Sequence, residues 1–193
     1  EFAAFPPLLY EGPFSGHISL REPLSLKDLE GVTREQALHE AARFLNCPED
    51  SLSFTGEGVG NLPVYSFTAG DSMVNITRQG GRPVYFKKAG GISAANFTTE
   101  QARRAAEEYL SGLGYGPMEL SYFLLNDNMA SFNFHGALDT EDGQPVICYP
   151  DLMKVTVELE KGGTIEFDAA GYVMNNHDRS IPAPKIPLDK AKS

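Results

Sequence analysis

The stretch that decides the fold is Val155-Thr156-Val157-Glu158-Leu159-Glu160-Lys161-Gly162-Gly163-Thr164-Ile165-Glu166-Phe167. Apolar residues alternate with polar ones on both sides of the glycine pair, which is typical of strands with one buried and one solvated face. Glycine readily adopts the positive φ that a tight turn between antiparallel strands requires. We therefore predict a β-hairpin with Gly162-Gly163 at its tip, and we expect Gly163 not to tolerate a β-branched side chain.

The same pattern occurs earlier in the chain, where Ser72 to Thr77 is followed by Gly80-Gly81 and then by Val84 to Phe86. A helix signal precedes each of the two patterns. Thr33-Arg34-Glu35-Gln36 and Thr98-Thr99-Glu100-Gln101 both fit the capping box, in which the Thr hydroxyl accepts from a helical amide and the Gln side chain reaches back. The recurrence predicts two structural repeats, each a capped helix followed by strands and a hairpin.

Apolar residues at helical spacing follow each capping box. In the first helix they are Ala37, Leu38, Ala41, Phe44 and Leu45, and in the second they are Ala102, Ala105, Ala106, Tyr109, Leu110 and Leu113. Pro48 cannot continue the first helix, and the glycines that begin at Gly112 end the second. We predict that Ala41 and Ala106 occupy equivalent buried positions, each against the sheet of its own repeat.

The segments between these signals complete the predicted fold. Strands are expected near residues 52–54, 64–67, 73–77, 84–86, 120–124 and 129–134, and residues 136–150 form a longer connection or an extra strand. The fold class is α+β, with tandem repeats of one α-helix packed on an antiparallel β-sheet. The predicted domains are an extended N-terminal arm (1–31), a first repeat (32–92), a second repeat (93–179), and a Pro-rich connector with the start of a truncated third repeat (180–193).

The composition limits the kinds of partner. The 193 residues include 16 Lys and Arg against 26 Asp and Glu, a formal net charge of −10. Such an acidic balance argues against binding to nucleic acid or to an anionic membrane, because both favour basic surfaces. No apolar run approaches the roughly 20 residues that a bilayer-spanning helix needs. Because Glu1 is not an initiator, we expect an excised fragment whose targeting and anchoring parts lie outside it.

Residue patterns for catalysis and metal binding are weak. Ser15 and His17 lie two apart in an extended segment, so their side chains point to opposite faces, and the Gly-x-Ser-x-Gly elbow is missing. The four histidines are scattered, and the acidic residues of 139–143 lack the closing Glu of a calcium loop, which leaves weak calcium binding as an open alternative. We predict no enzymatic activity, no cofactor and no metal site, with a small hydrolase of undetected type as the remote alternative.

Two flanking segments carry a family resemblance. They are Tyr10-Glu11-Gly12-Pro13-Phe14-Ser15-Gly16-His17 ahead of the repeats, and Tyr149-Pro150-Asp151-Leu152 with Gly171-Tyr172-Val173-Met174-Asn175-Asn176-His177-Asp178-Arg179. Together with the two Thr-x-x-Gln-Ala helices and the Gly-Gly hairpins, they resemble the tandem PepSY domains of YpeB-like spore germination proteins. The resemblance covers essentially the whole chain.

That resemblance implies a non-enzymatic role in the bacterial spore. Such proteins accompany a cortex-lytic peptidoglycan hydrolase in the dormant spore, and each partner is needed for the other's stability. They carry an N-terminal membrane anchor before these repeats and usually a further PepSY unit after them, which implies a place at the outer face of the inner membrane or in the cortex. PepSY domains elsewhere restrain peptidases, so a peptidase-inhibitory or sensing ectodomain of a cell-envelope protein is the alternative.

Residues without a place in the helix-on-sheet pattern are the candidates for partner binding. Exposed Tyr and Arg side chains beside a rigid scaffold are types that anchor protein contacts. The candidates are Tyr10, Phe14 and His17 before the repeats, and Tyr172, Asn175, His177 and Arg179 after the second hairpin. A structural alternative stays open for four of them: Tyr10 and Phe14 could instead pack across the repeats and fix their relative orientation, and His177 and Arg179 could likewise serve the fold.

Overall fold

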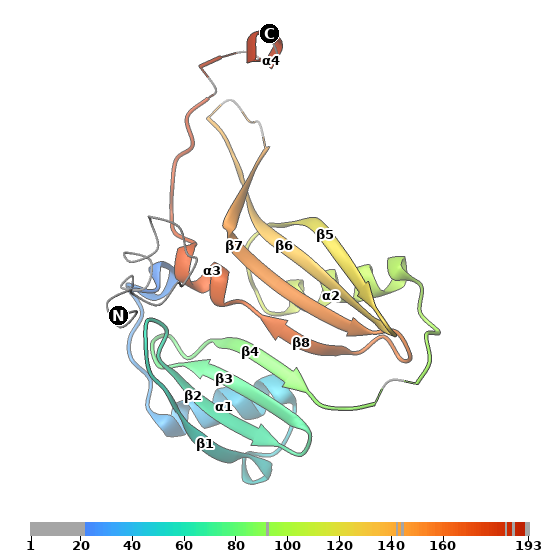
Figure 1. The fold of residues 1–193 in the computed structure, drawn as a ribbon. Coiled ribbons are helices and arrows are strands. Elements are labelled where there is room, and N and C mark those ends of the chain that lie inside the picture. Colours follow the sequence, from blue (N-terminus) through green and yellow to red (C-terminus); the bar gives the residue numbers. More distant parts are fainter. Residues whose placement is uncertain are drawn as a thin grey trace, which may run out of the picture.

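The computed structural model describes residues 22–91, 93–141, 143, 145–183, 185–186 and 188–191. Its strands are β1 (Ser53–Gly58), β2 (Val64–Ala69), β3 (Ser72–Thr77), β4 (Pro83–Lys88), β5 (Met118–Asn126), β6 (Met129–Asp139), β7 (Pro145–Glu158) and β8 (Thr164–Asp168). Its helices are α1 (Arg34–Leu45), α2 (Thr99–Gly112), α3 (Ala170–Asn175) and α4 (Leu188–Ala191), with short 3-10 turns η1 (Leu24–Leu26) and η2 (Glu49–Ser51). Figure 1 shows two similar units side by side, one from α1 to β4 and the other from α2 to β8.

All eight strands form one antiparallel sheet in the order β1-β2-β3-β4-β8-β7-β6-β5. The two units are joined where β4 pairs with β8, with Phe86 opposite Phe167 and Lys87 opposite Glu166. Helices packed on an antiparallel sheet confirm the predicted α+β class. The sheet runs unbroken from one unit to the next. A continuous sheet does not test where one domain ends and the next begins, and the predicted boundary near residue 92 stays a prediction.

Both predicted capping boxes are present. The Thr33 hydroxyl accepts from the Gln36 amide at 3.2 Å, and the Gln36 side chain accepts from the Thr33 amide at 2.7 Å. Thr98 and Gln101 make the same pair of bonds at 3.2 and 2.9 Å. Of the described helices, α2 is the longest at 14 residues, and none is long and apolar enough to cross a bilayer.

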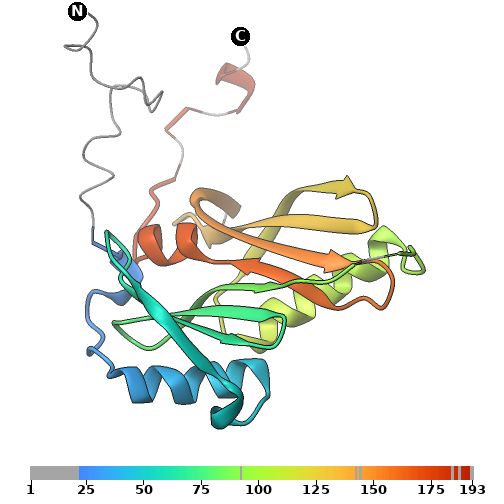
Figure 2. The ribbon, with the colours of Figure 1, turned by 60° about the horizontal axis from the view of Figure 1, so that its bottom comes forward.

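The two long helices cover the same face of the sheet. Val74, Phe86 and Phe167 stand directly opposite one another across β3, β4 and β8, so their side chains share a face. Val74 packs in the cluster that contains Ala41 of α1, and Phe167 packs in the cluster that contains Ala106 of α2. Ala41 and Ala106 are fully buried, which confirms the positions predicted for them. Figure 2 shows both helices on one side of the strands.

Aromatic rings connect the helices of the two units. The Phe44 ring of α1 lies 5.6 Å from that of Phe86 and 6.4 Å from that of Tyr109. The Tyr109 ring of α2 lies 5.6 Å from that of Phe167, and all three pairs are edge-to-face. Such pairs contribute about 0.5–1.5 kcal/mol each beyond the burial of their surface. The units are therefore held together by a shared core as well as by the sheet.

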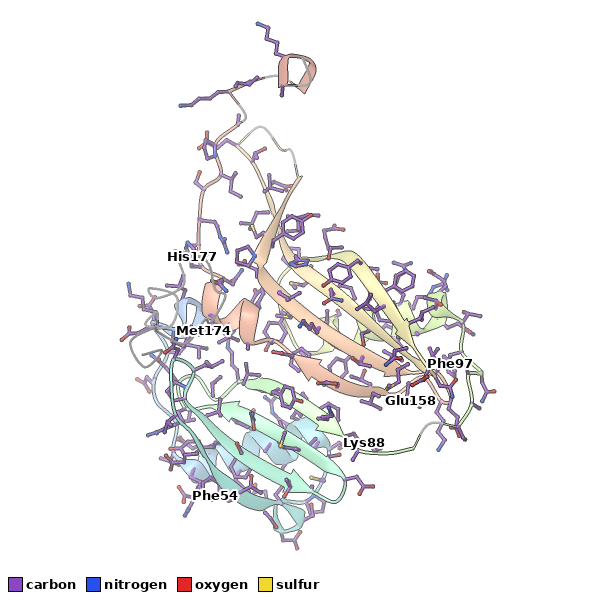
Figure 3. All side chains as sticks on the ribbon, in the orientation of Figure 1. Phe54, Lys88, Phe97, Glu158, Met174 and His177 are labelled. Carbon is purple, nitrogen blue, oxygen red and sulfur yellow. The ribbon has the colours of Figure 1, made fainter. Side chains whose placement is uncertain are left out.

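Each Gly-Gly pair lies in the turn of its hairpin and contains a glycine at positive φ, as predicted. The φ angles are 77° at Gly80, 61° at Gly81 and 78° at Gly162. Gly163 does not share this conformation, so the expectation that Gly163 is the intolerant position is wrong. The position that does not tolerate a larger side chain is Gly162, where an added Cβ would lie 2.4 Å from the Phe97 ring. Figure 3 shows Phe97 beside Glu158 at this end of the hairpin.

A carboxylate holds the β7–β8 turn together. The side chain of Glu158, of which 9% is exposed, accepts hydrogen bonds from the backbone amides of Glu160, Lys161 and Gly163 at 2.8 to 3.2 Å. These amides would otherwise lack partners in a tight turn. The alternation of the strand predicted Glu158 on the solvated face, but its carboxylate binds the amides of the turn.

Residues 136–150 prolong β6 and β7 and do not form a separate strand. Pairing runs from Met129 opposite Glu158 to Asp139 opposite Pro145. The register shifts between His135, which faces Leu152, and Gly136, which faces Cys148. The β7 residues between these two partners bulge out of the ladder, and Asp151 is one of them.

We predict that Gly162→Val lowers the free energy of unfolding by roughly 2–5 kcal/mol, since it adds the cost of left-handed backbone to a clash with Phe97. Gly163→Ala is the matched control, because its added carbon would meet Glu158 at an ordinary 3.5 Å. Urea denaturation of both variants measures the difference. Equal midpoints for Gly162→Val and the parent would contradict the turn geometry.

We also predict that Ala106→Asp loses cooperative folding. An unpaired carboxylate at a fully buried position costs roughly 3–5 kcal/mol, against a total stability of ~5–15 kcal/mol for a domain. Ser111→Asp puts the same group at an exposed position of α2 and should keep the parent's cooperative transition. Thermal unfolding followed by circular dichroism distinguishes the two; a cooperatively folded Ala106→Asp protein would show that another helix face is buried.

Candidate protein-binding site

The predicted binding residues that follow the second hairpin come together at one place. Asn175 ends α3, and His177 and Arg179 lie in the extended segment that follows it. Figure 3 shows His177 just beyond the end of α3. The candidates before the repeats lie outside the described residues; they are Tyr10, Phe14 and His17.

A fully buried carboxylate organises this region. Asp151, in the β7 bulge, has no exposed surface, and its Oδ2 accepts from Arg179 and from the Asn176 side chain, the latter at 2.9 Å. Gly136 makes room for it, because a Cβ there would lie 3.0 Å from Asp151 Oδ2. Arg179 keeps 22% of its side chain exposed. It therefore makes an ion pair within the fold, which is the structural alternative that stayed open for it, and its role in partner binding stays a prediction.

Backbone carbonyls fix the rest of the segment. The Asn175 side chain donates to Gly171 O at 2.8 Å and to Pro150 O at 3.1 Å, which ties α3 to the bulge. The Asn175 carbonyl accepts from Arg179 at 3.3 Å and from His177 Nδ1 at 2.8 Å. Asn175 is thus a positioning residue. Of the four predicted residues described, His177 is the one left exposed to a partner.

The expectation that Tyr172 is exposed is wrong. Its side chain is 8% exposed, and its ring packs edge-to-face on Tyr115 at 5.2 Å. The reason is α3, which the sequence analysis did not predict and which turns Tyr172 and Val173 into the core. Tyr115 in turn donates from its hydroxyl to Pro83 O at 3.0 Å, and burial raises the pKa of that hydroxyl, so it stays protonated as a donor.

A cleft of about 580 Å³ opens beside this cluster. It lies between the α2–β5 connection at Gly116-Pro117, the part of β6 from Gly136 to Leu138, and residues 176–180. The segment of residues 176–180 is held against the β6–β7 hairpin by two hydrogen bonds. Glu141 N donates to Ile181 O at 3.1 Å, and Ser180 Oγ donates to Glu141 at 3.0 Å. Exposed His177 and Asp178 stand at its rim, so the cleft offers a rigid, mixed polar surface.

The cleft does not present a catalytic arrangement. The Ser180 hydroxyl is bonded to Glu141 and not to His177, and His177 Nδ1 faces a carbonyl. A nucleophile needs a base within hydrogen-bond reach and a third group that orients the base. Across the described residues, no group of three or more His, Cys, Asp and Glu side chains could hold a metal ion.

A second cleft, of about 800 Å³, lies between α1, the β3–β4 turn and the end of α2. Several of its polar side chains already have partners within it, with His39 Nδ1 at 2.8 Å from Glu49 and Arg43 paired with Glu40. It contains none of the predicted binding residues. We therefore take the cleft beside α3 as the candidate site.

Comparison with known proteins places the chain in a family. Residues 1–182 match the family described as YpeB sporulation, PepSY1 and PepSY2 domains. The chain belongs to the YpeB family. YpeB relatives named Sporulation protein YpeB include that of Halalkalibacterium halodurans, 29% identical over 83% of this chain, and that of Bacillus subtilis strain 168, 25% identical over 90%. The chain spans 36% and 40% of these two relatives.

A solved YpeB structure shares the fold. The Bacillus megaterium YpeB C-terminal domain superposes with a TM-score of 0.73 at 28% identity, over 84% of this chain and 74% of that chain. The YpeB family match includes α3, the bulge around Asp151 and the segment through Arg179. The structural cluster described above therefore lies inside the part of the chain that the family shares.

The sequence did not predict the roles of Asp151 and Asn176 or the presence of α3. Asp151 was part of a quoted segment but had no role, because its partner Arg179 is distant in the chain and nothing local pairs them. The turn before α3 did carry a signal: an Asp side chain often accepts from the amide two residues on, and Asp168 Oδ1 accepts from the Ala170 amide at 2.9 Å.

We predict that Arg179→Ala destabilises the protein by roughly 3–5 kcal/mol, because it leaves Asp151 buried without its cation. Asp178→Ala, at the neighbouring exposed position, should leave the melting temperature unchanged. The double variant Asp151→Asn with Arg179→Ala should be more stable than Arg179→Ala alone, since the uncompensated charge is gone. Chemical denaturation of the three variants measures this; equal stability of Arg179→Ala and the parent would mean that the pair carries no weight.

Proposed function

We propose that this chain is a non-catalytic part of a spore protein that binds, and thereby stabilises or restrains, a cortex-lytic peptidoglycan hydrolase during sporulation and germination. The observation that carries the proposal is the YpeB family match over residues 1–182, which spans both repeats and the flank after them. The relatives that the chain resembles are sporulation proteins. The site of action that follows is the outer face of the spore's inner membrane or the cortex.

The chemistry of the candidate site supports binding without turnover. The polar groups of this segment are hydrogen-bonded within the fold: Arg179 and Asn176 bind Asp151, and Asn175 binds backbone carbonyls. These bonds make the segment rigid. A rigid surface loses little conformational entropy when a partner binds. The exposed pair His177 and Asp178 then supplies the polar contacts at the rim of the cleft. Tyr10, Phe14 and His17 remain proposed contacts on the arm.

We predict that the purified hydrolase of the same organism binds this chain, and that His177→Ala with Asp178→Ala weakens binding at least tenfold, a loss of ~1.4 kcal/mol. Both side chains are exposed, so the double variant should keep the parent's melting temperature. Isothermal titration calorimetry measures the affinities. Lys154→Ala, an exposed change on β7, is the control and should bind like the parent.

Two outcomes would count against the proposal. Absence of binding by the parent chain would overturn it for these residues, and parent-like binding by the double variant would clear His177 and Asp178 of the role. Incubation of the chain with peptidoglycan and with casein should release no soluble products. Release that His177→Ala abolishes would replace the binding role with a hydrolytic one.

A further inference from the structure

The strand at one edge of the sheet is unusually apolar and open. β5 pairs with β6 on one side and is the last strand of the sheet on the other. Four consecutive side chains on it are large, apolar and exposed: Tyr122 by 51%, Phe123 by 45%, Leu124 by 61% and Leu125 by 56%. An edge strand offers every second backbone amide and carbonyl to an incoming strand. β5 therefore combines free hydrogen-bonding groups with apolar surface.

The opposite edge shows how a sheet normally blocks such pairing. β1 is six residues long, and its register shifts between Phe54 and Gly56. The guanidinium of Arg34 covers the Phe54 ring at 5.3 Å. Short length, a bulge and a nearby charge are the usual protections against edge-to-edge association. β5 has nine residues, and beyond its bulge near Leu120 it carries neither a charge nor a proline.

Both faces of β5 are apolar at the exposed stretch. Tyr122 and Leu124 stand opposite Asn133 and Ser131 on the face away from the helices. The other two exposed side chains, those of residues 123 and 125, stand opposite buried residues on the helix face, and the ring of Phe123 lies 5.8 Å from that of Phe132. A strand added to this edge would find apolar neighbours for its side chains on both faces.

Carboxylates mark the two ends of the stretch. Glu119 lies on β5 before it, and Asp127 lies in the turn after it; within the described residues neither takes part in an ion pair. Eight residue steps separate them, roughly 26 Å along an extended strand. We propose that β5 is the docking edge for an extended, apolar segment of another protein that carries a basic residue at each end.

Charge argues against a second copy of this chain as the occupant. Two β5 strands paired antiparallel about Phe123 would place Glu119 of each copy opposite Asp127 of the other. Like charges directly opposite in a sheet are destabilising. Each copy also carries a formal net charge of −10, which repels the other. A basic-ended strand from a different protein meets neither obstacle.

This inference rests on the proposed function in one respect, that the chain acts by binding another protein. The two surfaces are distinct, because β5 lies at the far edge of the sheet from β4 and none of the β5 residues lines the cleft beside α3. Figure 1 shows β5 on the side of the second unit away from the first. The edge can therefore be tested without the hydrolase.

The probe is a synthetic peptide, Lys-Val-Tyr-Val-Tyr-Val-Tyr-Val-Lys, labelled for fluorescence anisotropy. We expect it to bind the chain and to slow amide hydrogen exchange in β5. The same peptide with Glu in place of both Lys residues should bind at least about tenfold more weakly. Absence of binding by the Lys-ended peptide, equal binding by both peptides, or protection of β1 in place of β5 would each overturn the proposal.

Variants of the chain separate the apolar and the charged parts of the edge. Leu124→Lys should abolish peptide binding, and Val59→Lys, at a position 89% exposed outside the strands, is its matched control. Glu119→Gln with Asp127→Asn should remove the preference for Lys over Glu ends; Asn is chosen because Asp127 has φ 49°, which Asn tolerates. Unchanged binding by Leu124→Lys, or an unchanged preference in the double variant, would refute the assignment. Hydrolase titration of the parent is scored separately, so each proposal can fail alone.

Discussion

The pairing of β4 with β8 is the interaction on which the rest of the structure depends, because neither unit is complete without it. Each unit alone would end in an unprotected strand beside a half-covered core. Pairing puts Phe86 opposite Phe167 and brings Phe44 and Tyr109 into the same aromatic group. It also leaves the described sheet with two edges, β1 and β5, in place of the four that separate units would have. The two edges then differ in how far they are protected.

The part of the connection just before α2, residues 93–97, is bonded to the β7–β8 turn. The carbonyl of Leu159, at the β7–β8 turn, accepts from the amides of Asn96 and Phe97 at 2.7 and 2.8 Å. Glu160 accepts from the amide and the hydroxyl of Ser93, and these bonds lower the pKa of its carboxyl. The segment before α2 therefore packs on the β7–β8 turn. Gly162 permits this contact, because a Cβ at that position would clash with the Phe97 ring.

Local signals in the sequence predicted local structure well. Thr33 and Thr98 cap helices through contacts three residues away, and the glycine pairs set turns through their own φ angles. What the sequence could not show is pairing between distant segments. The residues of β4 do not indicate that β8 is its neighbour. The alternation of apolar and polar residues in each strand is equally consistent with a separate sheet in each unit. For the same reason the ion pair of Asp151 with Arg179 could not be predicted. Asp151 lies in a β7 bulge that arises from the shift in pairing between β6 and β7.

The candidate site was found in part for the wrong reason. Tyr172 and Arg179 stood out because they had no place in the repeat pattern, and the structure gives both a structural place, one in the core and one on a buried carboxylate. His177 keeps an exposed position beside them. An unexplained residue in a repeat protein can thus mark a contact between units of the fold as readily as a contact with a partner.

A further contact joins η1, near the start of the described residues, to α3, which follows the last strand. Ser25, in η1, donates from its hydroxyl to the carbonyl of Val173 in α3 at 2.9 Å, and η1 packs on α3. Residues 24–26 and residues 170–175 therefore lie beside one another. A mechanical load applied between Ser25 and Arg179 would be shared by this η1–α3 contact and by the ion pair that ties Arg179 to Asp151 in β7. The described fold is therefore closed by more than one contact, and a pulling force must break both before these two segments separate.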